Sequence, residues 1–215
     1  MDVELIVFDL AGTTVKDNQD VQRALQKALA YFDVFISPHE INNVMGIPKP
    51  IAIKTLLERS DTWCDSVDDN LIREIHQVFV HQMLHFYEKD PSVEEKFRVT
   101  ETFLKLKESN LKVALDTGFD RKITNSILRR PGWSNLNLID ASVSSDEVKR
   151  GRPFPDMIYR VMELTHVKDP KRVAKVGDTA SDLLKEMQQV VDGLSGLLLV
   201  HSQKRNYKKK NTLIS

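Results

Sequence analysis

The sequence predicts an α/β protein: a doubly wound parallel sheet with an α-helical cap domain inserted into it. After residue 99, short apolar runs alternate with amphipathic segments, as in parallel strands joined by helices. Between residues 16 and 96 the pattern is helical throughout, so this block interrupts the alternation after the first strand. We therefore expect a core of residues 1–15 and 97–215 and a cap of residues 16–96.

The first strand is expected in the run ELIVFDL, residues 4–10, which has almost no polar residue before its aspartate. Continuous apolar runs of this length are typical of central parallel strands that are buried on both faces. The cap should begin with a helix over residues 17–32, where apolar residues recur at helical spacing.

The rest of the cap shows helix-start signals. Ser37, Pro38 and Glu40 form the signature of a capped helix N-terminus. Pro50 is expected at the first position of the next helix, and a long amphipathic helix should follow from Asp68.

The core resumes with alternating elements. In order, we expect a helix at 100–109, a strand at 111–117, a helix at 121–130, the run LIDASVSS, a helix at 155–165, a strand at 172–179, a helix at 180–191 and a strand at 196–200.

Composition excludes several classes of protein. Lysine plus arginine and aspartate plus glutamate both number 31, so the formal charge is zero, which argues against a surface-wide nucleic-acid binder. Cys64 is the only cysteine, so no internal disulfide can form and a reducing, cytoplasmic compartment is expected. We see no signal peptide, and the apolar runs are too short to span a bilayer. The basic tail after His201 is expected to be solvated rather than to bind nucleic acid.

Polar residues stand where the predicted strands end. Ligands of doubly wound sheets bind at the carboxyl ends of the strands, so these residues should converge on one rim. Carboxylates suit Mg²⁺, while hydroxyls, backbone amides and a guanidinium suit phosphate oxygens. The strand-end residues are Asp9, Gly12, Thr13, Thr14, Asp116, Thr117, Gly118 and Asp178. Asp182 follows one turn later, and Arg152 lies between the strands in a Gly-Arg-Pro turn.

Four segments, FDLAGTTV, LDTGF, GRPFPDMI and VGDTASDL, resemble in order the four motifs of the haloacid dehalogenase-type hydrolases. The resemblance spans nearly the whole chain and includes a helical cap after the first motif, on a Rossmann-like core. The Ala-Gly-Thr-Thr form of the first motif is similar to the phosphonatase-like branch, whose type enzyme is phosphonoacetaldehyde hydrolase.

This resemblance implies a role for each matching position. Asp9 would be the nucleophile that forms an aspartyl-phosphate. Asp9, the backbone carbonyl of Ala11 and Asp178 would hold Mg²⁺, and Asp182 would support the metal shell. The phosphoryl group would be bound by Gly12, Thr13, Thr117, Gly118 and Arg152, which replaces the superfamily's more usual lysine.

Ala11 stands where ordinary phosphatases of this superfamily carry an acid–base aspartate. Phosphonatases instead form an imine with a lysine, which stabilises the carbanion released from a C–P bond. Their lysine lies in a Met-Gly-x-x-Lys segment that corresponds here to Met45, Gly46 and Lys49. A solvated lysine or a phosphate clamp is the alternative for Lys49.

Three positions depart from phosphonatase. Ala52 replaces a histidine, Gln19 a cysteine and Phe119 a tyrosine, and the C-terminus also differs. The expected function is a Mg²⁺-dependent hydrolase of a small phosphonate or phosphate metabolite. Cap surfaces in this family can dimerise, so the resemblance leaves a homodimer open. A C–O phosphatase and a catalytically degenerate binding protein remain open as alternatives.

His81 and His85 lie four apart on one helix and are expected to be a surface pair.

Overall fold

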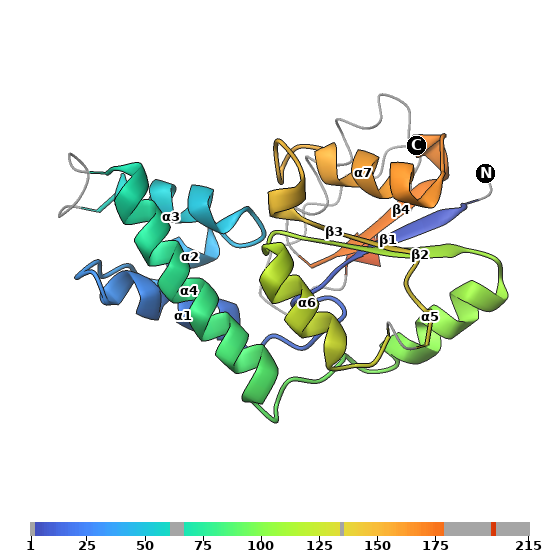
Figure 1. The fold of residues 1–215 in the computed structure, drawn as a ribbon, viewed down its shortest axis with the longest axis horizontal. Helices are drawn as coiled ribbons and strands as arrows, with labels where there is room; N and C mark the ends of the chain where they lie inside the picture. Colours follow the sequence, from blue (N-terminus) through green and yellow to red (C-terminus); the bar gives the residue numbers. More distant parts are fainter. Residues whose placement is uncertain (1–2, 61–66, 134–135, 179–198, 201–215) are drawn as a thin grey trace, which may run out of the picture.

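The computed structural model describes residues 3–60, 67–133, 136–178 and 199–200. A parallel sheet forms one half of the molecule and a block of helices the other (Figure 1). In chain order, the main elements are β1 (Leu5–Asp9), α1 (Asp20–Ala30), α2 (Pro38–Asn42), α3 (Lys49–Leu57), α4 (Asp69–Lys89), α5 (Val99–Glu108), β2 (Lys112–Thr117), α6 (Arg121–Arg129), β3 (Ala141–Ser144), α7 (Asp156–Thr165), β4 (Val173–Gly177) and β5 (Leu199–Val200). Two 3₁₀ turns, η1 (Ser145–Glu147) and η2 (Pro170–Arg172), precede α7 and β4.

The five strands are all parallel, in the order β3-β2-β1-β4-β5. β1 lies at the centre because the chain adds β2 and β3 on one side of it and then crosses to add β4 and β5 on the other. This change of direction makes the carboxyl ends of β1 and β4 the switch point at which doubly wound sheets bind ligands. The predicted fold class is confirmed.

Helices cover both faces of the sheet (Figure 1). α7 packs on the face that carries Leu5 and Val7 of β1, where its own Ile158 and Val161 are fully buried. α5 and α6 lie on the opposite face, where Phe8 of β1 contacts a larger apolar core. Side chains of a strand alternate between its faces, so the β1 sequence supplies both cores in turn.

The helices α1 to α4 are inserted between β1 and β2, as the sequence predicts for residues 16–96. Their starts follow local chemistry. The Ser37 hydroxyl accepts a hydrogen bond from the Glu40 amide at 3.3 Å in a capping box, and Asp68 accepts one from the Leu71 amide at 2.7 Å. α3 begins at Lys49, so Pro50 is its second residue and not its first.

Two short segments connect the helical block to the sheet and lie against each other. The Lys16 amide donates to the Glu94 carbonyl at 3.0 Å, and the Lys96 amide donates to the Thr14 carbonyl at 2.8 Å. Val15 and Glu95 form an antiparallel bridge between them. These crossings coincide with the predicted cap boundaries, although the division into two domains stays a prediction.

The remaining expectations for secondary structure fall into two groups. The helices and strands expected between residues 97 and 178 are present, within a few residues of their predicted ends. The helix expected at 180–191 lies outside the described residues, and only Leu199 and Val200 of the last predicted strand are described.

Candidate functional site

Asp9 ends β1 and is only 5% exposed. The turn that follows it is held by the Gly12 amide, which donates to the Val15 carbonyl at 2.8 Å, and by the Thr14 hydroxyl, which donates to the Asp9 carbonyl at 3.0 Å. Gly12 adopts a φ of 90°, a conformation that residues with a Cβ rarely adopt. These bonds fix the backbone at the end of β1, where the Asp9 side chain begins.

Asp178 follows β4 and lies directly against this turn. Its Oδ1 accepts a hydrogen bond from the Thr13 hydroxyl at 3.1 Å. A Cβ atom on Gly12 would lie 2.4 Å from Asp178 Oδ2, so only a glycine leaves room for the carboxylate. Two of the residues predicted to hold Mg²⁺ thus flank the switch point of the sheet, and Asp178 is exposed to solvent.

Arg152 reaches the same rim from the loop before α7. Its Nη1 lies 2.9 Å from Asp9 Oδ1, and the arginine side chain is almost completely buried. Its Nη2 donates to the Asp116 carbonyl oxygen at 3.0 Å and forms an ion pair with the Asp116 carboxylate. A buried guanidinium beside the predicted nucleophile is suited to a phosphoryl group, whose charge needs compensation.

Sequence reasoning placed Asp116 among the carboxylates of the rim, and it overlooked Lys175. The structure buries Asp116 completely, in ion pairs with Lys175 and Arg152. Lys175 comes from β4, is fully buried and forms an ion pair with Asp116. Burial raises the pKa of the Asp116 carboxyl, but the charges of Lys175 and Arg152 outweigh it and hold that pKa below its ordinary value. A lysine inside the apolar run VAKVG was the signal available in the sequence, since an unpaired charge is rarely buried there.

Thr117 and Gly118 end β2 and continue the rim. The Thr117 hydroxyl is buried and accepts a hydrogen bond from the Phe119 amide at 3.3 Å. The Ser145 hydroxyl donates to the carbonyl oxygens of Gly118 and Phe119, both at 3.0 Å. These bonds fix the loop whose hydroxyl and amide are predicted to bind the phosphoryl group.

The segment from Gly46 to Pro48, between α2 and α3, is seated on the rim of the sheet. A Cβ atom on Gly118 would lie 2.9 Å from the Gly46 carbonyl oxygen, and one on Gly151 would lie 2.4 Å from Pro48 Cγ. The φ values of Gly118 and Gly151 lie outside the positive range, so close approach explains these two glycines. The helical block is thus closed over the strand ends.

Lys49 follows this segment and is 4% exposed. Its ammonium lies 5.9 Å from the ring centre of Phe79 on α4 and 5.7 Å from that of Phe119 after β2. It also donates to the Ile47 carbonyl oxygen at 3.4 Å. The alternative of a solvated lysine is wrong, because the side chain is enclosed between helical block and sheet.

The three departures from phosphonatase occupy different surroundings. Ala52 is fully buried on α3, Gln19 is exposed before α1, and Phe119 is the ring that contacts Lys49. His76 on α4 stacks on Phe79, with ring centres 6.4 Å apart. Burial lowers the pKa of the His76 imidazole, with the charge of Lys49 adding to this and the charges of Asp120 and Asp146 opposing it.

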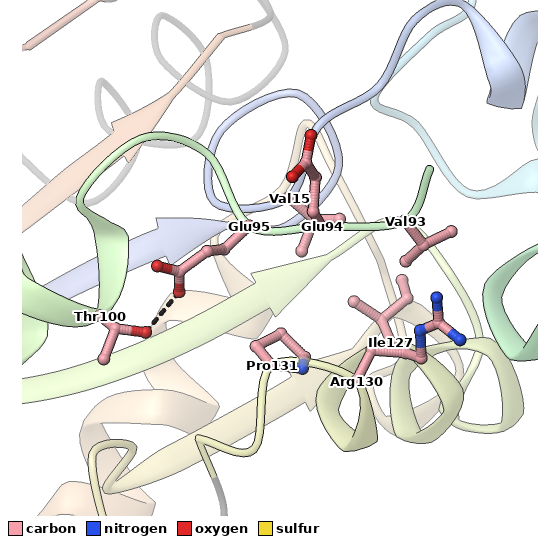
Figure 2. A pocket seen from close by; sticks show the side chains of 8 residues that line it. All are labelled: Val15, Val93, Glu94, Glu95, Thr100, Ile127, Arg130 and Pro131. Carbon is pink, nitrogen blue, oxygen red and sulfur yellow. Dashed lines mark hydrogen bonds between the residues drawn. The ribbon is translucent and has the colours of Figure 1, made fainter. Parts of the chain in front are cut away.

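A separate cavity lies beneath the segments that connect the helical block to the sheet (Figure 2). Its volume is about 400 Å³, and none of the predicted site residues lines it. The Trp133 indole beside it donates to Glu95 Oε2 at 3.1 Å. The cavity is lined by Val15, Val93, Glu94, Glu95, Thr100, Ile127, Arg130 and Pro131.

Asp182 lies outside the described residues. His81 and His85 are exposed on α4, and in the described part of the chain no three His, Cys, Asp or Glu side chains are grouped to hold a metal. None of the described helices is both long and apolar enough to cross a membrane.

The sequence matches the haloacid dehalogenase-like hydrolase family over residues 3–184. It is 30% identical to a phosphonoacetaldehyde hydrolase of Bacillus cereus over 196 residues, which cover 85% of this chain and 71% of that enzyme. A phosphonoacetaldehyde hydrolase of Latilactobacillus sakei is 25% identical over 190 residues, with the same coverage of both chains.

Two solved structures share the fold. A phosphonoacetaldehyde hydrolase-like protein from Oleispira antarctica superposes with a TM-score of 0.79 at 22% identity, covering 88% of this chain and 70% of its own. CbbY from Rhodobacter sphaeroides, solved in complex with phosphate, superposes with a TM-score of 0.76 at 17% identity, covering 96% and 90%.

Proposed function

Since the chain belongs to the haloacid dehalogenase-like hydrolase family, we propose that it removes a phosphoryl group from a small phosphonate or phosphate metabolite, with Asp9 as nucleophile. The observation that carries this proposal is the buried contact of 2.9 Å between Asp9 Oδ1 and Arg152 Nη1 at the switch point of the sheet. A carboxylate and a guanidinium held together there provide an attacking oxygen and a charge for the phosphoryl oxygens.

The proposed reaction has two steps. In the first, Asp9 attacks phosphorus and the bond from phosphorus to the leaving group breaks, with its electron pair departing on carbon or oxygen. In the second, water attacks the aspartyl-phosphate, which releases inorganic phosphate and restores the carboxylate. Arg152 and the Thr117 loop would hold the phosphoryl oxygens through both steps.

Mg²⁺ fits the residues present. Asp9 and Asp178 supply carboxylates on either side of the turn that contains the Ala11 carbonyl, and Gly12 leaves space for the Asp178 carboxylate. Asp9, the Ala11 carbonyl and Asp178 would hold the ion, with Asp182 in support. When bound, the ion would neutralise negative charge on the transferring group.

Two features favour a C–P substrate over a C–O substrate: residue 11 is an alanine, and Lys49 is buried near the rim. Ala11 has no proton to give to a leaving alcohol. Lys49 is enclosed by the rings of Phe79 and Phe119, and such an apolar enclosure suits an amine that condenses with an aldehyde. The imine, formed with loss of water, would accept the electron pair of the broken C–P bond as an enamine, and hydrolysis would return the lysine.

The test is a substrate panel with Mg²⁺ that contains phosphonoacetaldehyde, sugar phosphates and p-nitrophenyl phosphate. We expect wild-type protein to release acetaldehyde and phosphate from phosphonoacetaldehyde, and borohydride to trap the substrate on Lys49. Lys49→Arg keeps the charge but cannot form an imine, so this activity should be lost while p-nitrophenyl phosphate is still cleaved.

Asp9→Asn is the matched control for covalent catalysis, and it should lower every activity by about 10,000-fold or more. Release of phosphate from sugar phosphates without trapping would favour a C–O phosphatase. No turnover across the panel, with metal binding intact, would identify a degenerate binding protein.

A further inference from the structure

Two fully buried charged residues, Asp116 and Lys175, have no task in the proposed reaction. Lys175 Nζ and Arg152 Nη2 both bind Asp116 Oδ1. Asp116 Oδ2 has no hydrogen-bond partner among the residues that the structure describes. A carboxylate that receives two cations on one oxygen, with no access to water, calls for an explanation beyond surface charge pairing.

The register of the sheet explains how these charges meet. Asp116 on β2 is paired with Asp9 on β1, and Lys175 on β4 is paired with Val7, two residues earlier on β1. Because side chains alternate along a strand, Asp9, Asp116 and Lys175 all point to the face of the sheet that α7 covers. Arg152, in the loop before α7, joins this layer through its contacts with Asp9 and Asp116.

The two terminal nitrogens of the Arg152 guanidinium have different partners. Nη2 is held by the Asp116 carbonyl oxygen at 3.0 Å and by the Asp116 carboxylate, while Nη1 lies 2.9 Å from Asp9 Oδ1. The planar guanidinium has a fixed geometry, so binding of Nη2 restricts the directions in which Nη1 can point. A lysine could not be oriented in this way, because its ammonium is a single point charge.

We propose that Asp116 is a positioning residue that orients Arg152 toward Asp9 and the phosphoryl group, and that Lys175 balances the charge of Asp116. This inference rests on the proposed function of Asp9 and Arg152. It makes Asp9, Asp116, Arg152 and Lys175 one unit with no net charge, in which Asp116 acts only through Arg152.

Charge balance supports this arrangement. Removing one partner of a buried ion pair leaves an uncompensated charge, whereas replacing both partners by apolar groups of similar volume is often tolerated. The charges of Lys175 and Arg152 keep the pKa of Asp116 below its ordinary value despite its burial, so the carboxylate is charged at neutral pH. We therefore expect a variant that lacks both Asp116 and Lys175 charges to fold.

The experiment is a double-mutant cycle between Asp116 and Arg152. It compares wild type, Asp116→Ala, Arg152→Ala and the double variant by kcat and KM for p-nitrophenyl phosphate and by the affinity for inorganic phosphate. We expect Asp116→Ala to lower kcat by about 100-fold, the cost of misplacing a catalytic group by about 1 Å, with a smaller change in KM. The double variant should be no slower than Arg152→Ala. If the loss of kcat in the double variant equals the product of the losses in the two single variants, the proposal is overturned, because Asp116 then acts independently of Arg152.

Asp116→Leu combined with Lys175→Met covers the case in which Asp116→Ala does not fold. This pair removes both buried charges, so we expect a folded protein with the same low kcat. A folded pair variant with wild-type kcat would refute the positioning role.

Thr165→Val is the matched control. Thr165 is a buried residue at the end of α7, and its hydroxyl donates to the Val161 carbonyl oxygen at 2.8 Å. This variant should keep wild-type kcat. A loss of kcat equal to that of Asp116→Ala would mean that removal of any buried polar group loosens the site.

If wild-type protein cleaves nothing in the panel, the proposed function fails. The cycle on phosphate affinity still tests Asp116, since equal phosphate affinity of Asp116→Ala and wild type would refute positioning.

Discussion

At the scale of single residues, the site depends on charges that are buried together. Asp9 was predicted from its position at a strand end and Arg152 from its Gly-Arg-Pro turn, and the structure brings them into contact. Asp116 was expected only as one carboxylate of the rim and Lys175 was overlooked. Their ion pair joins residues that are 59 positions apart and depends on the register of both strands with β1. Sequence indicates which residue types stand at a strand end, but not which of them share one oxygen.

His76 gives a prediction at this scale. Burial lowers the pKa of its imidazole in the folded protein below the ordinary value of about 6.5. Between these two pKa values the unfolded chain binds more protons, so the free energy of unfolding should decrease as the pH falls from 7 toward 5. His76→Gln should show a shallower decrease, measured by urea unfolding at a series of pH values.

His85→Gln is the control for this measurement, because it removes an exposed imidazole from the same helix. We expect it to keep the wild-type slope. A His76→Gln variant whose stability changes with pH as steeply as that of wild type would show that His76 is not a source of the dependence.

At the scale of elements, the seating of the segment 46–48 on the sheet has a simple steric basis. Gly151→Ala would place a Cβ atom 2.4 Å from Pro48 Cγ, so this segment or the Arg152 loop must shift. Overpacking of this kind costs about 1–3 kcal/mol. We expect Gly151→Ala to raise KM and lower kcat, because Lys49 and Arg152 lie on the two displaced segments.

Pro48→Ala removes the Cγ atom and supplies the compensating change. The double variant Gly151→Ala/Pro48→Ala should recover a large part of kcat/KM, measured with the substrate that the panel identifies. If the double variant is as impaired as Gly151→Ala, the contact with Pro48 is not the cause.

The elements themselves were largely predictable, for physical reasons that differ from one to another. The central strands are apolar runs, and the starts of α2 and α4 carry capping residues, so local sequence suffices for both. The start of α3 was misplaced by one residue, because a proline is tolerated anywhere in the first turn of a helix. The enclosure of Lys49 was not predictable, since it requires Phe79 and Phe119 from elements that are distant in sequence.

At the scale of the whole molecule, one apolar core connects the helical block to the sheet. It includes Leu25 of α1, Phe79 of α4 and Leu115 of β2, all fully buried. Phe119 links the two halves, because its ring lies 6.4 Å from that of Phe79 and 6.0 Å from that of Tyr87. A domain inserted only through two linkers would not be expected to share its core so extensively with the sheet.

This shared core predicts that the chain unfolds in one transition. Trp133 is fully buried near the sheet, and its ring contacts Phe103 of α5, so its fluorescence reports on that half of the molecule. In a Trp63→Phe background, Trp133 is the only tryptophan of the chain. Far-UV circular dichroism, dominated by helices, should follow the same urea curve as this fluorescence.

Phe119→Leu gives the contrast. Loss of its ring contacts should lower the free energy of unfolding, because ring pairs of this kind contribute about 0.5–1.5 kcal/mol each beyond their buried area. If this residue couples the halves, the two curves should separate in this variant while they coincide in the Trp63→Phe background. Separate curves already in that background would establish residues 16–96 as an independently folding cap, which is the division that the sequence predicts.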